Sequence, residues 1–193
     1  MAPAPLRILL GHNYYRSSAP SGEDAVFENE RRLLEENGVT VIPFVRRNDD
    51  LDDGSLPRRV RIALATVWAR DARRELAALV ARERPDVAHF HNTFPQLSPS
   101  VYAACRDHGV PVVQTLHNFR LVCAGALLQR DGRPCEDCLD GGSVAGLLPG
   151  LRHRCYRGSL AATGALTAML AANRARGSYR RGVDRYIALT RFA

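Results

Sequence analysis

Histidine is followed by asparagine at three places in the sequence, each just past a short apolar run. The three pairs are His12-Asn13, His91-Asn92 and His117-Asn118. Imidazole and carboxamide groups both donate and accept hydrogen bonds, which suits a ligand rich in hydroxyl or phosphate groups. In an open α/β sheet, residues just past the carboxyl ends of the strands converge on one ligand-binding crevice. The three pairs therefore predict a single polar binding site.

The apolar runs alternate with amphipathic segments, a pattern typical of a parallel sheet with helices on both faces. We expect strands at 6–10, 39–44, 86–91, 110–116 and 184–189. We expect helices at 24–36, at about 56–83, between Ser98 and Gly109, and at about 160–175. The predicted fold class is α/β with a Rossmann-like sheet, and 193 residues suffice for one domain with its own core.

The first strand does not lead into a common nucleotide-binding loop. Neither G-x-G-x-x-G nor a Walker A motif follows it, and all 27 basic residues are arginine, so a P-loop or Schiff-base lysine is excluded. The segment Ser21-Gly22-Glu23-Asp24 opens the first helix instead. A glycine there lets a phosphate approach the backbone N–H groups of the helix N-terminus. A simple helix cap is the alternative interpretation.

The composition is that of an ordinary globular protein, with 46% apolar and 24% charged residues. No apolar stretch approaches the ~20 residues of a membrane helix, and the N-terminus does not resemble a signal peptide. The net charge of +7 suits a surface that faces phosphates or anionic lipid, whereas no nucleic-acid-binding motif accompanies it. We expect a cytoplasmic location, extending to the inner face of the membrane if the arginines contact lipid, and no nucleic-acid partner.

Two arginine-rich stretches are candidates for peripheral membrane contact, with a solvated basic face as the alternative. The first comprises Arg58, Arg59, Arg61, Arg70, Arg73 and Arg74. The second comprises Arg152, Arg154, Arg157, Arg174, Arg176, Arg180 and Arg181.

Four of the five cysteines lie in a segment at about 121–158 that is rich in glycine and arginine. They follow the spacing Cys123-x11-Cys135-x2-Cys138-x16-Cys155. In a reducing compartment, four thiolates favour a structural zinc ion over disulfides. A disulfide pair and unlinked thiols remain the alternatives. Cys105, on a helix face with Val101, is expected to be a small core residue.

Several separate motifs together resemble one known family. They are HNYY at 12–15, PSGED at 20–24, ENE at 28–30, HFHNTFP at 89–95, SPSVY at 98–102, TLHNFR at 115–120 and DRYIALTRF at 184–192. The chain is similar in these motifs, over nearly its whole length, to the N-terminal domain of family 4 glycosyltransferases of the GT-B fold. That family implies two Rossmann-like domains, an acceptor side and a donor side, and a retaining reaction that needs no metal or other cofactor for chemistry.

The resemblance also implies roles for individual residues. His117 would be the catalytic residue, placed against the donor sugar. The donor-phosphate loop would be Ser21, Gly22 and Glu23, although the family usually has two glycines where this chain has Ser21-Gly22. The acceptor contacts would be His12, Asn13, Tyr14, Tyr15, His91, Asn92, Asn118 and Arg120.

The resemblance covers one half of the expected architecture. Residues 1–193 correspond to the acceptor-side domain, with the Cys-rich segment as an insertion, and the E-x7-E motif of the donor-binding C-terminal domain is absent. We therefore expect an incomplete half with little activity alone, because positioning two reactants is a large part of catalysis. The predicted function is transfer of a hexose-like sugar from a nucleotide-sugar donor to a glycan or lipid-linked acceptor, in cell-envelope or polysaccharide synthesis. The alternative is a non-catalytic Rossmann-like binding module with a zinc-pinned loop.

Overall fold

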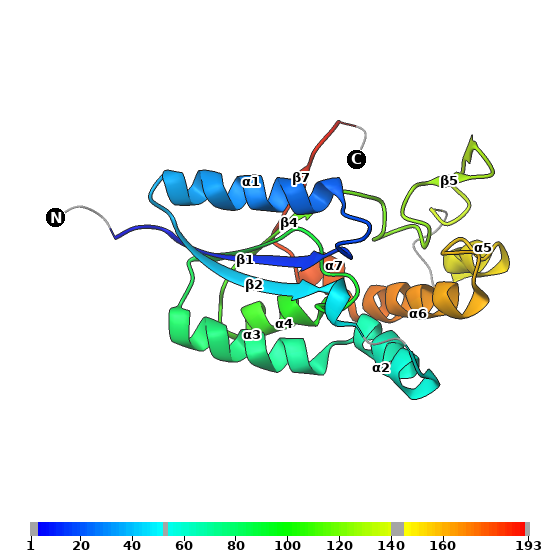
Figure 1. Cartoon of the computed structure of the whole chain (residues 1–193), viewed down its shortest axis with the longest axis horizontal. Helices are drawn as coiled ribbons and strands as arrows, with labels where there is room; N and C mark the ends of the chain where they lie inside the picture. The colour runs from blue at the N-terminus through cyan, green and yellow to red at the C-terminus, as the bar shows by residue number, and fades with distance from the viewer. Residues whose placement is uncertain (1–3, 52–53, 140–144, 192–193) are drawn as a thin grey trace.

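The computed structural model describes residues 4–51, 54–139 and 145–191, which form a parallel sheet with helices on both faces (Figure 1). The five strands of the sheet are β1 (Arg7–Tyr14), β2 (Thr40–Arg47), β3 (Val87–Phe90), β4 (Val112–Leu116) and β7 (Arg185–Ala188). They are all parallel and lie in the order β2-β1-β3-β4-β7. The predicted α/β class with a Rossmann-like sheet is confirmed.

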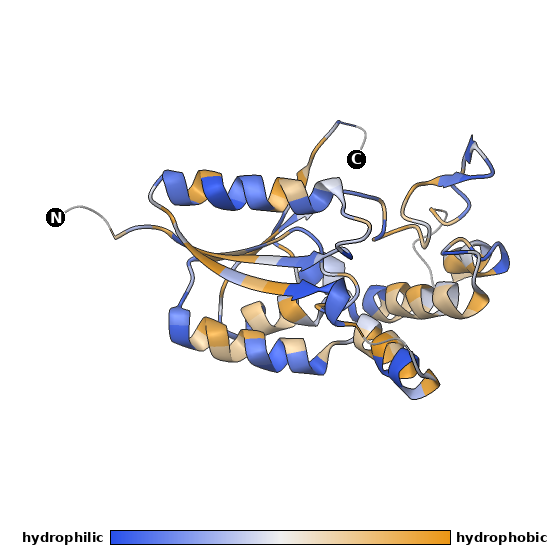
Figure 2. Cartoon of the chain, in the orientation of Figure 1, coloured by the Kyte–Doolittle hydropathy of each residue, from blue (hydrophilic) through white to orange (hydrophobic). Residues whose placement is uncertain are grey.

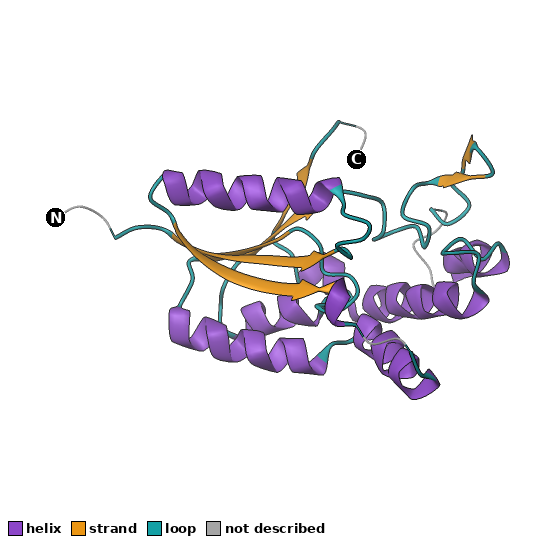
Figure 3. Cartoon of the chain, in the orientation of Figure 1, coloured by secondary structure: helices purple, strands orange, loops and turns teal. Residues whose placement is uncertain are grey.

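The helices form a layer on each side of this sheet (Figure 3). One face is covered by α1 (Gly22–Glu36), and the other by α3 (Arg70–Glu83) and α4 (Ser100–Asp107), which pack against each other. Beyond the carboxyl ends of the strands lie α2 (Leu56–Val67), α5 (Leu148–Arg152) and α6 (Leu160–Arg176). The short elements are η1 (Asn48–Asp50), β5 (Gln129–Arg130), β6 (Arg133–Pro134), η2 (Ala145–Leu147) and α7 (Ser178–Arg181).

The core forms two layers because successive side chains of a strand point to opposite faces of the sheet. Leu9 packs with the residues of α3 and α4, whereas Leu10 packs with Phe27 of α1, and all three side chains are fully buried. Strands β1 and β2 become hydrophilic toward their carboxyl ends (Figure 2). The polar edge of the sheet therefore faces α2, α6 and the Cys-rich segment.

The first strand is longer than predicted. It runs to Tyr14, so the pair His12-Asn13 lies within β1, in register with Val45 and Arg46 of β2, and not beyond its end. The other two pairs follow β3 and β4, as expected. The strand continues because the backbone of β1 remains paired with β2 as far as Tyr14 and Arg47, even though the residues there are polar.

The predicted helix at about 56–83 is wrong: two helices, α2 and α3, meet at a break. Trp68 has an extended backbone, with φ −156° and ψ 101°, and the backbone N–H of Ala69 donates to Ser98 Oγ at 2.9 Å. After the break, α3 packs on α4 while α2 packs on α6. None of the described helices combines the length and the apolar character needed to span a bilayer.

Candidate functional site

A cavity of about 40 Å³ lies where β3 and β4 end. Five of the predicted site residues line it: His91, Asn92, His117, Asn118 and Arg120. The rest of its wall comes from Thr93, Phe94, Tyr102, Gln114, Thr115, Leu116, Leu121, Met169 and Tyr179. The two later His-Asn pairs therefore do converge on one crevice at the carboxyl edge of the sheet.

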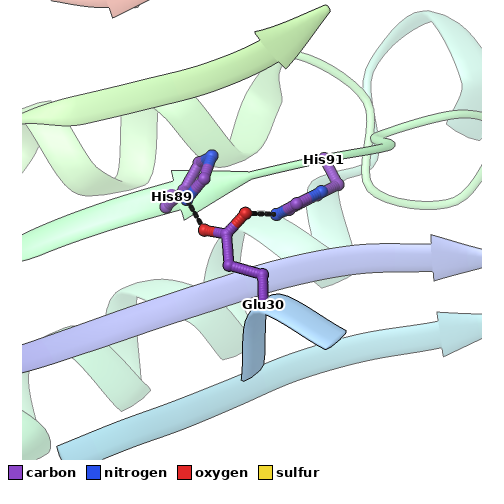
Figure 4. Close-up of side chains that lie close together, drawn as sticks. All are labelled: Glu30, His89 and His91. Atoms are coloured by element: carbon purple, nitrogen blue, oxygen red, sulfur yellow. Dashed lines mark ion pairs between the residues drawn. The ribbon is translucent and has the colours of Figure 1, made fainter. Parts of the chain in front are cut away.

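The carboxylate of Glu30, on α1, lies between the side chains of His89 and His91 (Figure 4). Glu30 Oε1 lies 2.7 Å from His89 Nδ1, and Glu30 Oε2 lies 3.3 Å from His91 Nε2. Burial alone would raise the pKa of Glu30, but the contacts with His89 and His91 outweigh it and lower the pKa to about 2. Glu30 is therefore ionised at neutral pH. Its Oε1 accepts from His89 Nδ1, whereas the longer contact from Oε2 to His91 Nε2 lacks hydrogen-bond geometry.

The chain of polar contacts continues from His91 to His117. His91 Nδ1 lies 3.0 Å from His117 Nε2, and the two rings are stacked with their centroids 5.2 Å apart. With the His91 proton placed on Nε2, the nitrogen that faces the Glu30 carboxylate, Nδ1 accepts and His117 Nε2 donates. The tautomers assigned from these partners leave the Nδ1 of His117 as a hydrogen-bond acceptor.

His117 itself is half-buried and is held neutral. Burial and the neighbouring His91 lower the pKa of His117 from its usual 6.5 to about 4. On the other side of the carboxylate, His89 Nε2 lies 2.7 Å from Thr115 Oγ1, and the hydroxyl donates because His89 Nδ1–H faces Glu30. The contacts along the row Thr115–His89–Glu30–His91–His117 are therefore consistent with one set of proton positions.

A second cluster joins α1 to the loop that follows β4. Asn118 Nδ2 donates to Glu23 Oε1 at 2.7 Å, and the hydroxyl of Tyr15 donates to the same oxygen at 3.3 Å. The guanidinium of Arg120 lies 4.5 Å from the ring centre of Phe94 and 5.6 Å from that of Tyr156. Among the described residues, Glu23 Oε2 and Arg120 Nη1 are buried without a hydrogen-bond partner. This cluster therefore has spare hydrogen-bonding capacity beside the cavity.

A family model described as "Glycosyl transferase 4-like domain" matches residues 8–192. The chain belongs to this glycosyltransferase family. No curated protein and no solved structure matched the chain. The glycosyltransferase assignment therefore rests on a match that spans both clusters just described.

Three of the predicted acceptor contacts of the glycosyltransferase domain are buried inside it, which corrects the expectation that they line a pocket. His12 and Asn13 have no exposed surface, and Tyr14 is 7% exposed. His12 Nε2 lies 2.8 Å from Asp24 Oδ1, and its ring stacks on Phe27. The extension of β1 carries His12 and Tyr14 into the layer between the sheet and α1. Asn13 points to the opposite face, where its Oδ1 accepts from the backbone N–H of Gln96 at 3.0 Å.

The polar groups of these buried residues tie neighbouring segments together. Asn13 Nδ2 donates to Asn48 Oδ1 at 2.8 Å, and the Tyr14 hydroxyl donates to Glu28. Asn92 lines the cavity, but its amide donates to the Asn13 carbonyl at 2.8 Å and its Oδ1 accepts from the backbone of Phe94 at 2.9 Å. These contacts hold the ends of β1 and β3 in place.

The predicted donor-phosphate loop forms the N-terminus of α1. Ser21 is the N-cap, and its Oγ accepts from the backbone N–H of Glu23 at 3.3 Å. The side chain of Asp24 accepts from the backbone N–H of Ser21 at 3.2 Å, which completes a capping box. Gly22 is exposed, and a Cβ added to it would meet nothing within 4 Å. The backbone at Gly22 therefore lies open although local packing does not require a glycine.

Sequence reasoning assigned no role to Glu30 or His89. A signal was present, because Glu23, Phe27 and Glu30 recur at helical spacing on the face of α1 that packs on the sheet. A carboxylate in a buried stripe demands a partner, and two histidines at alternate positions of β3 can supply it. The spacing alone did not reveal that α1 crosses above β3.

The four clustered cysteines also come together in the structure. Cys123, Cys135, Cys138 and Cys155 line a second cavity, of about 20 Å³. All five cysteines of the chain lie in its described part and are free thiols. Cys105 is fully buried in α4, in keeping with the expected core position. Of the predicted insertion, residues 140–144 lie outside the described residues.

Proposed function

We propose that this domain is the acceptor side of a retaining glycosyltransferase that moves a sugar from a nucleotide-sugar donor to a glycan or lipid-linked acceptor. The observation that carries the proposal is the row of polar contacts that ends on His117. It presents a neutral imidazole with a free Nδ1 at the cavity, supported by the ionised Glu30. Such a group accepts a hydrogen bond from a sugar hydroxyl without adding charge.

His117 would orient the donor sugar by this hydrogen bond. A preorganised acceptor is worth more than a mobile one because its orientation costs nothing at the moment of reaction. In the reaction, the acceptor oxygen forms a bond to the anomeric carbon and the bond from that carbon to the diphosphate breaks. The acceptor proton passes to an oxygen of the leaving phosphate, so the protein need not supply a general base.

The N-terminus of α1 would hold the donor diphosphate. Its backbone N–H groups carry partial positive charge, and the exposed Gly22 leaves room for a phosphate to approach them. Ser21 shapes this terminus as its cap, while Glu23 uses its carboxylate to hold Asn118. The role of Glu23 is thus to join the phosphate end of α1 to the loop that carries His117.

The acceptor would bind beside the cavity at Arg120. Arg120 offers a buried Nη1 with no partner among the described residues, and the rings of Phe94 and Tyr156, which meet edge to face, flank its guanidinium. Tyr15 and Asn118 lie within the same cluster. The donor base would be selected by a second domain, in keeping with the GT-B arrangement.

A lipid-linked acceptor would bring the domain to a membrane surface, and α2 has suitable chemistry. Its side chains Leu56, Val60 and Leu64, spaced by four residues, are 75%, 50% and 67% exposed. Arginines at 58, 59 and 61 accompany them, and α2 contains no acidic residue. A basic helix with an exposed apolar stripe suits the interface of an anionic bilayer.

The ligand site can be tested by mapping amide chemical shifts in isotope-labelled protein. We expect UDP- or GDP-linked sugars to shift the amides of Gly22, Glu23, His117 and Asn118, while amides of α3 stay unchanged. A matched titration of His117→Ala should give weaker shifts at the loop after β4. A panel of nucleotide sugars that shifts only amides elsewhere, or none, would overturn the proposal in favour of a non-catalytic module.

A further inference from the structure

The four cysteines of the insertion meet although they are spread over more than thirty residues of chain. They form the wall of the 20 Å³ cavity together with Ala124, Gly125, Gln129, Arg130, Asp137, Pro149 and Gly150. A space of this size holds one water molecule or ion, not a second side chain. Apart from Arg130 and Asp137, which bond to each other at 2.6 Å, the polar side chains around it are thiols and one amide.

Two glycines let the backbone come close to the sulfur atoms. A Cβ on Gly150 would lie 3.5 Å from Cys138 Sγ, and a Cβ on Gly125 would lie 3.8 Å from Cys123 Sγ. The Gly125 position is also only 3.3 Å from the carbonyl oxygen of Cys155. The chain is therefore packed closely around the thiols and leaves their common space open.

The backbone of the insertion adopts conformations that need support. Five of the seven non-glycine residues with positive φ in the described chain lie here: Ala126, Leu128, Asp131, Arg154 and Arg157, with φ between 50° and 65°. Each such residue costs on the order of 1 kcal/mol and persists only where its surroundings determine it. An uncross-linked loop of this length would not retain five of them.

Ordinary packing supplies little of that support. The only strands in the described part of the insertion, β5 and β6, have two residues each. Few of its apolar side chains are buried; Ala124 and Leu147 join the cluster around α6, whereas Leu127, Leu139 and Leu148 are exposed. A cross-link between the distant parts of the insertion would replace the missing core.

We propose that Cys123, Cys135, Cys138 and Cys155 bind one structural zinc ion. Four thiolates form the closed tetrahedral shell that structural zinc prefers, and the Cys-x-x-Cys pair follows a short hairpin, as ligand pairs do in zinc ribbons. The four cysteines line one cavity, but their sulfurs are not yet at ligand distance from one another. Among the described residues, only Glu30, His89 and His91 bring three possible ligand atoms within 4.8 Å of one another. Each cysteine has a single side-chain torsion, so rotation about it brings the sulfur inward.

The cluster of Glu30, His89 and His91 is a weaker candidate for a metal site than the four cysteines. The two oxygens of Glu30 already face His89 Nδ1 and His91 Nε2, and the remaining nitrogens of His89 and His91 bond Thr115 and His117. An ion between them would have to break these contacts. Among the described residues at the thiol cavity, Cys135 bonds Asp137 and Cys138 bonds the Gly150 backbone, so a bound ion would replace fewer contacts there.

The zinc would act on the site through Tyr156, which directly follows Cys155. Tyr156 and Phe94 flank the guanidinium of Arg120, so fixing Cys155 fixes one side of the Arg120 stack. This consequence depends on the proposed function, but zinc binding itself does not. The zinc-bound insertion would thereby hold Arg120 in place at the cavity.

The test is the metal content of untagged protein purified from zinc-supplemented cells under reducing conditions. We expect one zinc ion per chain in the wild type and in the control Cys105→Ala, and none in Cys135→Ser/Cys138→Ser. Wild-type protein without zinc, with iron in its place, or with thiols lost to disulfides would overturn the proposal. So would a double variant that keeps its zinc.

A second measurement covers the case in which the double variant does not fold. Wild-type protein stripped of metal is titrated with Co²⁺, which should give sulfur-to-cobalt charge-transfer bands and the strong visible bands of a tetrahedral site. Proteolysis within 121–158 should slow when Zn²⁺ is restored. Absence of thiolate bands at saturating Co²⁺ would contradict the assignment whatever the behaviour of the variants.

Discussion

At the scale of single residues, protonation is the feature that the structure adds to the sequence. Two histidines, His89 and His91, contact one ionised carboxylate, and a third, His117, contacts His91, so the neighbours of each nitrogen indicate which atom carries the proton. His117 was predicted from its position after a strand and from the family resemblance. Glu30, which lies 87 positions before His117 in the sequence, was not predicted, because no local pattern shows where α1 crosses the sheet.

The titration of His117 is a direct consequence. Because burial lowers its folded-state pKa from 6.5 to about 4, the folded protein binds fewer protons than the unfolded chain between these values. The stability it contributes is present above about pH 6.5 and is lost as the pH falls through 4. Imidazole NMR signals of His117 should stay constant from about pH 8 to about pH 6 and then move with a midpoint near 4. A midpoint near 6.5 would contradict this environment.

Removing the carboxylate charge should damage both the fold and the site. In Glu30→Gln the amide can accept only one of the two imidazole N–H groups and turns a donor toward the other. We expect the free energy of unfolding to fall by about 2 kcal/mol, the usual scale for hydrogen bonds to a charged group. Denaturant unfolding measures it, with the exposed Glu35→Gln on the same helix as the control. Equal stabilities of the two variants would show that the row is not held by charge.

At the scale of elements, the ends of α1 and α2 could be predicted to different degrees. The cap at Ser21 was predicted, since serine, glycine and acidic residues in that order define a helix start. The break between α2 and α3 was not, because apolar residues keep helical spacing across it. Two packing partners, α6 for one half and α4 for the other, turn the helices apart. No single helix axis could bury both halves.

A substitution at Gly22 can distinguish the helix-capping role of the α1 N-terminus from its proposed role in phosphate binding. Alanine at this position meets no atom within 4 Å and suits a first helical residue, so Gly22→Ala should unfold at or slightly above the wild-type denaturant concentration. If phosphate approaches the backbone here, the same variant should bind the nucleotide sugar at least about tenfold more weakly, a loss of about 1.4 kcal/mol. An unchanged affinity for the nucleotide sugar, measured by titration, would mean that Gly22 is not needed for phosphate binding.

The exposed stripe of α2 predicts lipid binding. A triple variant, Leu56→Ser, Val60→Ser and Leu64→Ser, should lose most of its sedimentation with anionic phosphatidylglycerol vesicles and little stability, since these side chains are largely exposed. The matched control replaces Leu33, which is 59% exposed on α1, by serine. Equal sedimentation of the two variants would contradict a membrane role for α2.

At the scale of the whole molecule, the alternation of strands and helices was enough to predict the parallel sheet and the meeting of polar residues at the carboxyl ends of its strands. Two of the three His-Asn pairs lie at that edge, while pairing with β2 draws the third into the core. The order of strands brings β3 between β1 and β4, which places His91 beside His117. Long-range placement of this kind depends on the tertiary packing and not on local propensity.

The central claim is that the cavity after β3 and β4 is the sugar-transfer site, with His117 in contact with the donor sugar. Its most direct test is the transfer rate of His117→Ala in the full-length gene product, measured with the nucleotide sugar identified by shift mapping. We predict a rate about 10- to 100-fold below wild type, with unfolding free energy within about 1 kcal/mol and with the exposed His108→Ala variant unaffected. A His117→Ala enzyme that transfers sugar at the wild-type rate would contradict the account.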